Sequence, residues 1–411
     1  MQQRINPCSV MKCAMSIACT ITILLGVPVA RQMAGSHFSH NFQRGGRRPG
    51  GTGAVIRVVY LGGGLNVIGV DEYRGHAFVL SDPGNNDGQP TGLGTVSVLD
   101  TRRGALLHTT TVGLRPSALV VDQNTGRVFV TVIGFRGKNV YPNDPPHGQL
   151  RIVDARSGAL QHTARVGAAP DEIAVDDRTG RVFVVGGASV STLDAATGQL
   201  LRTVRMVGLG GGQSAVASRV GHVFVTIYEP SSVAMFDATN GQPIRTLRVG
   251  DHPDSIAVDE QTERVFVADQ TSAVVNDVNV LDARSGALLH TTAVGFGLST
   301  IIVDDRTQRV FILDLNGIAM LDARTGALLR RDTMNRYRGQ AGGIALNDRA
   351  GRLYVTTDRG LLVLDAHTGV ILHIVSVGQA TGAIAVDTQS QRAFVINGSR
   401  NSISVIDTTK I

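Results

Sequence analysis

Short apolar runs separated by polar turns fill this chain from residue 54 onward. The stretch from Asp171 to Gly208 shows the pattern most clearly. Its runs are rich in Val, Ile, Leu, Thr and Phe, which suit half-buried strands, and none combines helical period with helical length. We therefore predict four strands in this stretch, at Ile173–Val175, Arg181–Val185, Val190–Leu193 and Leu200–Val207.

The turns inside this unit are of one kind. The sequence DDRTG ends at Gly180, and the sequence DAATGQ begins at Asp194. Gly adopts the positive φ of a tight turn at little steric cost, and the Asp carboxylate can accept bonds from backbone N–H groups nearby. The unit is therefore predicted to be a four-stranded antiparallel meander.

The same unit recurs along the chain. An aromatic residue marks the second strand of each copy, at Phe78, Phe129, Phe183, Phe224, Phe266, Phe311, Tyr354 and Phe394. An Asp ends each third strand, at Asp100, Asp154, Asp194, Asp237, Asp282, Asp322, Asp365 and Asp407. Four strands repeated about every 40 residues indicate a β-propeller. We predict an all-β fold, a β-propeller of eight four-stranded antiparallel blades.

The two ends of the repeat region predict how the ring closes. The last copy stops after Asp407 without a fourth strand, whereas Ala54–Asp71 aligns without a gap on Ala105–Asp122. Residues 54–61 thus form an outer strand with no blade of their own. We expect them to join the C-terminal blade, because closure removes exposed sheet edges. A seven-bladed ring with an irregular extra unit is the alternative.

The first 53 residues differ from the repeats. Residues 1–30 combine Arg4 and Lys12 with an apolar run over residues 14–30, which predicts a signal peptide or an N-terminal membrane anchor. Residues 31–53 are rich in Gly and Arg and predict a flexible linker, so the propeller covers residues 54–411. All three Cys lie in residues 1–30, which leaves the propeller without a thiol nucleophile or a disulfide.

One stretch carries a resemblance to a known family. Val249–Gly295 contains VGDHP, IAVD, VFVA and VLDARSG. These motifs resemble the YVTN-type propeller repeat of secreted or surface proteins from bacteria and archaea. The resemblance extends over residues 54–408 and implies an extracytoplasmic scaffold with a binding role. It implies no reaction, because likeness of fold alone supplies none.

Several motifs have a structural interpretation beside a chemical one. The repeated Asp residues are predicted to cap turns rather than to form a carboxylate array. LDARTGALL, beginning at Leu321, resembles the repeat of quinone-dependent dehydrogenases, but the chain has no Trp to dock neighbouring blades. DPGNNDG, beginning at Asp82, lacks the distal Glu of an EF-hand and is predicted to be a solvated turn. Gly208–Ser214 precedes a strand rather than a helix, and so predicts a turn instead of a phosphate site.

Loops that precede the first strands are the predicted place for function. They share one face of the ring with three insertions, at residues 81–94, 133–149 and 269–279. We predict that a ligand-binding site on this face contains Arg115, Asp171, Glu172, His252, Asp254, Arg336 and Arg338. The competing interpretation is that these residues are ordinary polar side chains at the mouth of the central pore. These residue types are similar in part to the metal ligands of lactonase-type propellers.

The net charge is +6, and the basic residues are almost all Arg, many of them in the repeated turns. This distribution favours a solvated surface over a nucleic-acid stripe. We expect a monomeric, extracytoplasmic scaffold that binds a protein or glycan, with no catalytic residue, metal, cofactor or nucleic acid, and with membrane contact only through the N-terminal segment. The alternative is an enzyme, a metal-dependent lactonase or hydrolase with its site on the insertion face.

Overall fold

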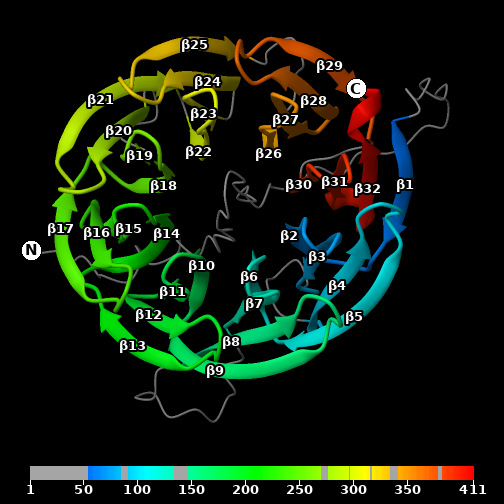
Figure 1. The fold of residues 1–411 in the computed structure, drawn as a ribbon, viewed down its shortest axis with the longest axis horizontal. Coiled ribbons are helices and arrows are strands. Elements are labelled where there is room, and N and C mark those ends of the chain that lie inside the picture. The colour runs from blue at the N-terminus through cyan, green and yellow to red at the C-terminus, as the bar shows by residue number, and fades with distance from the viewer. Residues whose placement is uncertain are drawn as a thin grey trace, which may run out of the picture.

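Each repeat folds into a four-stranded antiparallel sheet, and eight such sheets surround a central axis (Figure 1). The computed structural model describes residues 54–84, 91–133, 147–269, 276–295, 297–314, 317–333, 341–377 and 382–411. The predicted signal or anchor and linker, part of the first insertion and most of the other two, and Arg336 and Arg338 lie outside these residues. The eight-bladed β-propeller is confirmed.

The strands take four positions from the axis outward (Figure 1). The inner strands are β2 (Leu65–Asp71), β6 (Pro116–Asp122), β10 (Pro170–Asp176), β14 (Leu209–Ala217), β18 (Pro253–Asp259), β22 (Leu298–Asp304), β26 (Ala341–Asn347) and β30 (Ile384–Asp387). The second strands are β3 (His76–Ser81), β7 (Arg127–Val132), β11 (Arg181–Gly186), β15 (His222–Glu229), β19 (Arg264–Asp269), β23 (Arg309–Asp314), β27 (Arg352–Thr357) and β31 (Arg392–Asn397).

The third strands are β4 (Gly94–Asp100), β8 (His147–Asp154), β12 (Ser189–Asp194), β16 (Ser232–Asp237), β20 (Asn276–Asp282), β24 (Gly317–Asp322), β28 (Gly360–Asp365) and β32 (Ser402–Asp407). The outer strands are β5 (Leu106–Gly113), β9 (Leu160–Ala168), β13 (Leu200–Arg205), β17 (Pro243–Arg248), β21 (Leu288–Gly295), β25 (Leu328–Thr333), β29 (Ile371–Val375) and β1 (Val55–Tyr60). Two short 3-10 helices, η2 (Gly398–Arg400) and η3 (Thr408–Lys410), flank β32. Blades are numbered 1 to 8 from β2, so that β30 opens blade 8.

The N-terminal strand closes the ring as predicted. β1 pairs antiparallel with β32, with Val55 opposite Ile406 and Tyr60 opposite Ser402. A bond from the Asp407 N–H to the Ala54 carbonyl (2.8 Å) fixes one end of this pair. The C-terminal blade therefore takes its outer strand from the opposite end of the chain.

The core consists of seams between adjacent blades. One buried cluster joins Val67 and Phe78 of blade 1 to Leu119 and Val128 of blade 2. All eight recurrent aromatic residues are buried, with exposed fractions of 0–1%. These seams explain why every blade repeats an aromatic residue in its second strand: each sheet must cover the face of its neighbour.

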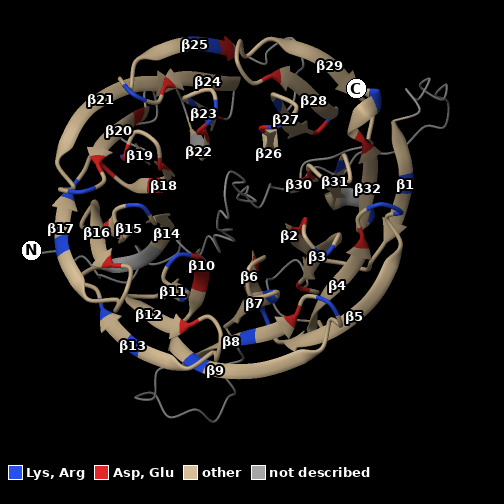
Figure 2. Ribbon diagram, viewed as in Figure 1, with Lys and Arg blue, Asp and Glu red and all other residues tan. Residues whose placement is uncertain are grey.

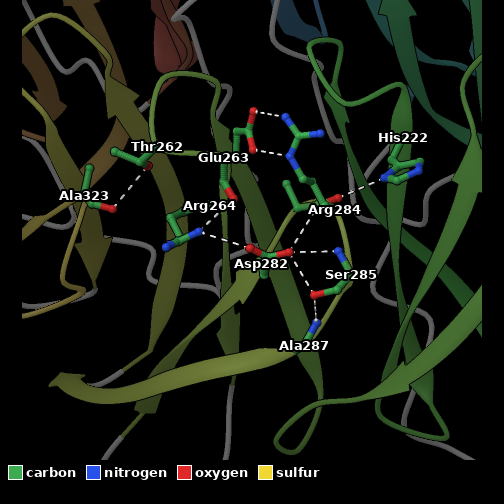
Figure 3. A network of polar contacts seen from close by, with 10 residues as sticks. His222, Thr262, Glu263, Arg264, Asp282, Arg284, Ser285, Ala287 and Ala323 are labelled. Atoms are coloured by element: carbon green, nitrogen blue, oxygen red, sulfur yellow. Dashed lines mark hydrogen bonds and ion pairs between the residues drawn. The ribbon is translucent and has the colours of Figure 1, made fainter.

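Alternating strand direction gives the ring two different faces. We call the face with the Asp-x-x-Thr/Ser-Gly turns the turn face, and the opposite one, where chain enters each inner strand, the loop face. Figure 3 shows the turn after β20, in which the Asp282 carboxylate accepts hydrogen bonds from the Ser285 N–H (2.8 Å) and hydroxyl (2.8 Å). Asp282 also forms an ion pair with Arg264 (3.2 Å). Burial opposes ionisation of Asp282, but these bonds and the Arg264 charge outweigh it and lower its pKa. The prediction that the repeated Asp residues cap turns is confirmed.

Polar bonds also link the blades at the turn face. Glu72 accepts bonds from the N–H (2.9 Å) and hydroxyl (2.8 Å) of Thr388 across the seam where the ring closes. The Glu260 carboxylate of blade 5 likewise accepts hydrogen bonds from the backbone N–H groups of Ser218 (2.6 Å) and Arg219 (3.0 Å) in blade 4. At these two seams the residue that follows the inner strand thus helps to hold neighbouring blades together.

Candidate functional site

Three loop-face residues adopt a backbone conformation that is unusual outside Gly. Arg115, Ala169 and His252 have φ values of 55°, 47° and 53°. Each directly precedes the Pro that begins an inner strand of blades 2, 3 and 5. Left-handed backbone is disfavoured for residues with a Cβ atom, and strain of this kind gathers at functional sites. Two predicted site residues, Arg115 and His252, therefore occupy equivalent positions.

A β-bulge then determines which carboxylates face outward. The register of β10 against β11 shifts between Pro170 and Glu172, and that of β18 shifts between Pro253 and Ser255. The bulged residues, Asp171 and Asp254, are half-buried. Glu172 has an exposed fraction of 1% and accepts a bond from the Ser214 hydroxyl in the next blade (3.3 Å). The structure thus places Glu172 inside the seam between blades 3 and 4, and leaves Asp171 and Asp254 half-buried in separate blades.

Further polar bonds make the loop face rigid. The Ser117 hydroxyl donates to the Pro170 carbonyl (2.6 Å), which links blades 2 and 3. The Ser255 hydroxyl bonds to Gln213 (3.1 Å) and accepts from the Ile301 N–H (3.1 Å), which links blades 4, 5 and 6. Side chains on this face are therefore presented from fixed backbone positions.

An aromatic pair lies at the loop face between blades 4 and 5. The Tyr228 and His252 rings have centroids 4.4 Å apart and planes tilted by 34°. The backbone N–H of His252 also donates to the Ser231 hydroxyl (3.2 Å), which fixes the His252 loop to the β15–β16 turn. Tyr228 is 47% exposed and Val207 is 88% exposed. We call Val207, Tyr228, Pro230 and His252 the aromatic patch.

A close backbone approach holds Val207 beside that turn. Gly208 has a φ of 134°, and a Cβ atom there would overlap the Glu229 carbonyl oxygen and lie 3.0 Å from the Pro230 ring. Only Gly fits this approach without displacing the turn. The loop after β13 and the turn after β15 therefore form one surface.

Carboxylates flank the aromatic patch. Asp251 is exposed next to His252, and Asp269 is fully buried at the end of β19. Burial raises the pKa of Asp269 to about 7; the bond from Asn279 opposes the rise, while the charges of Asp277 and Asp251 add to it. The equivalent residue in blade 6, Asp314, instead forms an ion pair with Arg331 (2.8 Å). Among the described residues, Asp269 therefore has no cationic partner like that of Asp314.

Arg115 belongs to another part of the loop face. Its charge opposes the effect of burial, which raises the pKa of Asp82. The predicted site residues are thus distributed: Arg115 acts on Asp82 of blade 1, whereas His252 lies against Tyr228 of blade 4. Arg336 and Arg338 lie outside the described residues.

Sequence reasoning missed Tyr228 and Asp269. A signal existed for Asp269, because this Asp ends the strand RVFVAD directly after four apolar residues. A weaker signal existed for Tyr228, since β15 runs on to Glu229 and is longer than the other second strands. Both residues lie outside the repeated motifs. Differences between blades are found in these non-repeated positions.

Within the described ranges, no three His, Cys, Asp or Glu side chains are grouped so that they could hold a metal ion. No helix in the described part of the chain is both long and apolar enough to span a membrane.

Comparisons with known proteins identify the architecture. No protein-family model matches the sequence, and no curated protein matches it. BamB from Moraxella catarrhalis is 12% identical, with a TM-score of 0.60, over 86% of this chain and 99% of that chain. The β-propeller domain of Swd1 from Myceliophteria thermophila is 11% identical, with a TM-score of 0.56, over 74% and 99%. Hydrazine synthase from Kuenenia stuttgartiensis is 13% identical, with a TM-score of 0.55, over 72% and 96%. Likeness at such identities shows the fold alone.

Proposed function

We propose that this chain is an extracytoplasmic β-propeller that binds a protein partner through the aromatic patch of its loop face. The Tyr228–His252 ring pair carries this proposal, because the half-buried His252 holds an exposed Tyr228 beside Val207. Exposed aromatic side chains combine large contact area with a polar group and are enriched at protein interfaces.

Charge around the patch suggests the chemistry of the partner. The exposed carboxylates of Glu229 and Asp251 flank Tyr228 and His252. Complementary charge at the rim of an interface directs association and selects among partners. The partner we propose therefore presents an apolar or aromatic group surrounded by Lys or Arg.

The location is proposed from the sequence. Arg4 and Lys12 followed by the apolar run over residues 14–30 support export or anchoring. The resemblance to YVTN-type repeats supports the same location. A membrane-tethered or secreted scaffold is the role that combines this location with the exposed patch.

Photo-crosslinking tests the proposed binding. A photoreactive amino acid is placed in the full chain at Tyr228, and in a second variant at Ile244, an outer-strand residue of the same blade with a similar exposed fraction of 43%. We expect a discrete protein adduct in cells of the natural host from position 228 and none from position 244. Equal adducts from both positions, or none from position 228, would contradict the proposal.

A metal-dependent hydrolase is the second candidate. The observation in its favour is electrostatic: burial and the charges of Asp251 and Asp277 raise the pKa of Asp269, although these three described side chains are not grouped as a metal site. A divalent cation would relieve this repulsion. Thermal unfolding with EDTA and then with added Ca²⁺, Zn²⁺ or Mn²⁺ separates the candidates, because a ligand of the folded state raises the apparent stability. The hydrolase requires a shift that Asp269→Asn abolishes, whereas the scaffold requires none.

A further inference from the structure

The charge of this chain is divided unevenly along its length. Residues 54–411, which form the ring, carry equal numbers of basic and acidic residues, and Figure 2 shows both kinds interspersed over the described blades. Residues 1–53 contain neither Asp nor Glu. The whole net charge of +6 therefore belongs to residues 1–53, at Arg4, Lys12, Arg31, Arg44, Arg47 and Arg48.

The predicted linker, residues 31–53, combines this charge with aromatic side chains. Phe38 and Phe42 stand among its Arg residues, in the sequence SHFSHNFQRGGRRPG that begins at Ser36. In the ring, by contrast, no Phe among the described residues is exposed. The linker thus has the chemistry that the proposed function expects of a partner, an aromatic group surrounded by Arg.

Carboxylates outnumber Arg residues in the strands and turns next to the aromatic patch. They come from the end of β15, the start of β18 and the loop before it, and the adjoining ends of β19 and β20, whereas the Arg residues end β13 and β17. The carboxylates are Glu229, Asp251, Asp254, Asp269 and Asp277, and the Arg residues are Arg205 and Arg248. This excess of negative charge suits a cationic segment.

The effect of this crowding is visible at Asp269. Burial raises the pKa of Asp269, and the charges of Asp251 and Asp277 add to the rise. A nearby positive charge favours the ionised form of a carboxylate and so reduces such repulsion. Arg side chains placed beside Asp251 would therefore lower the electrostatic cost of this part of the loop face.

Tyr228 supplies the contact surface for an aromatic segment. Its side chain is 47% exposed, and Val207 beside it is 88% exposed. Phe rings pack favourably on aromatic side chains, and a guanidinium group above a Tyr ring gains a cation–π contact. A segment that carries both Phe and Arg can therefore use the apolar part of the patch and its acidic surroundings together.

The position of Ala54 decides which copy of the linker can bind. Ala54 accepts a bond from the Asp407 N–H at the turn face of blade 8, whereas the patch lies at the loop face between blades 4 and 5. β1 and β15 lie on opposite sides of the ring (Figure 1). The ring is about 50 Å across and about 20 Å deep. The roughly 12 residues from Phe42 to Ala54 span at most about 43 Å, so Phe42 and the Arg residues after it do not reach the patch of their own chain.

We propose that residues 31–53 of one copy bind the aromatic patch of a second copy, with Phe side chains on Tyr228 and Arg side chains beside Glu229 and Asp251. This inference rests on the proposed function, because it names the partner of the same patch. It also replaces the monomer expected from the sequence by an association of copies. The contact joins two different surfaces, so copies associate head to tail.

Crosslinking between two tagged copies tests this contact. Two full chains with different epitope tags are produced in one cell, and one of them carries a photoreactive amino acid at Tyr228. We expect irradiation to join the two copies, with residues 31–53 of the other copy in the crosslinked peptide. The same photoreactive group at Ile244, an exposed outer-strand position of the same blade, is the control and should give no such product.

Charge variants in the second copy test the role of Arg. The linker set removes three charges, by Arg44→Gln, Arg47→Gln and Arg48→Gln. The control set removes the same charge from exposed turn-face positions, by Arg102→Gln, Arg103→Gln and Arg156→Gln. An exposed ion pair contributes about two- to fivefold in affinity. We therefore expect the crosslinked product to fall at least about fivefold with the linker set and less than about twofold with the control set.

An aromatic variant tests the role of Phe. Phe38→Ser combined with Phe42→Ser removes both rings and leaves the charge unchanged. Because an aromatic anchor contributes about fivefold or more to an interface, we expect the crosslinked product to fall by at least that factor. Neither linker variant alters a described contact of the ring, so a loss of product reports on binding rather than on folding.

Three results would overturn this inference. The first is an adduct from position 228 that contains another protein and never a second copy, which would leave the proposed function intact. The second is a crosslink between position 228 and residues 31–53 of the same copy. The third is an equal loss of product with the linker and control charge sets. Absence of any protein adduct from position 228 would contradict the proposed function as well, so the two failures are distinguishable.

Discussion

At the scale of single residues, small departures from the repeat decide what each blade presents. His252 occupies a left-handed position that Gly would accept without strain. The bulge after it leaves Asp254 half-buried and buries Ser255. A strand shifted by one residue turns its side chains to the other face, so the bulge explains why Asp171 is half-buried while Glu172 is not exposed.

The backbone of His252 provides a clean test of its side chain. His252→Gly removes the imidazole that stacks on Tyr228 and relieves the left-handed strain, while the unfolded chain gains freedom. We expect these effects to offset, leaving the free energy of unfolding within about 1 kcal/mol of the natural chain. Chemical denaturation measures that stability, and the Tyr228 crosslink should fall in the same variant. A large loss of stability would assign His252 to the structure rather than to binding.

Asp305 gives the stability a defined dependence on pH. Burial and the neighbouring charge of Asp259 raise the pKa of Asp305 to about 7. The folded state therefore binds a proton more tightly than the unfolded state, so the free energy of unfolding falls as the pH rises from about 4 to about 7. Burial and the charges of Asp122 and Asp176 raise the pKa of Asp177 to about 6, with the same sign.

Asp305→Asn should weaken that dependence. An amide can donate to the Asp259 carboxylate without adding charge, so we expect the variant to be more stable by on the order of 1 kcal/mol at pH 8 and not at pH 5. Denaturant unfolding at both pH values checks this. Asp348→Asn, at the equivalent but exposed position of blade 7, is the matched control and should change neither value. A gain that is the same at both pH values would contradict the account.

At the scale of elements, the seam between blades is the structural unit. Buried aromatic residues of each second strand pack against the next blade, and polar bonds such as Ser117–Pro170 cross the same seams. The β1–β32 pair completes the last of these sheets with residues from the first strand of the ring. Stability of the whole propeller therefore depends on a short strand with little burial of its own.

Truncation tests the role of β1. A chain that begins at residue 54 keeps the β1–β32 pair, whereas one that begins at residue 62 leaves the β32 edge open. An open edge invites pairing with other chains. We expect the shorter chain to unfold at a lower temperature and to aggregate, and the longer one to match the full chain. Equal melting temperatures of the two truncated chains would show that ring closure contributes little.

At the scale of the whole molecule, the sequence predicted the repeating features and missed the unique ones. The recurrent Phe and Asp positions predicted eight blades, and the alignment of residues 54–71 on a complete unit predicted closure by β1. Tyr228 gave only the weak signal of a longer second strand, because its contact with His252 joins two blades and does not follow from the repeat. Periodicity reports packing that every blade must satisfy, whereas a site depends on differences between blades.

The central claim is that the loop face binds a protein through the aromatic patch. Crosslinking in intact cells from Val207, which belongs to the patch, and from Ala196, in the turn before the same outer strand, tests this claim most directly. The account predicts a protein adduct from position 207 and none from position 196. A protein adduct from position 196 and none from position 207 would contradict it.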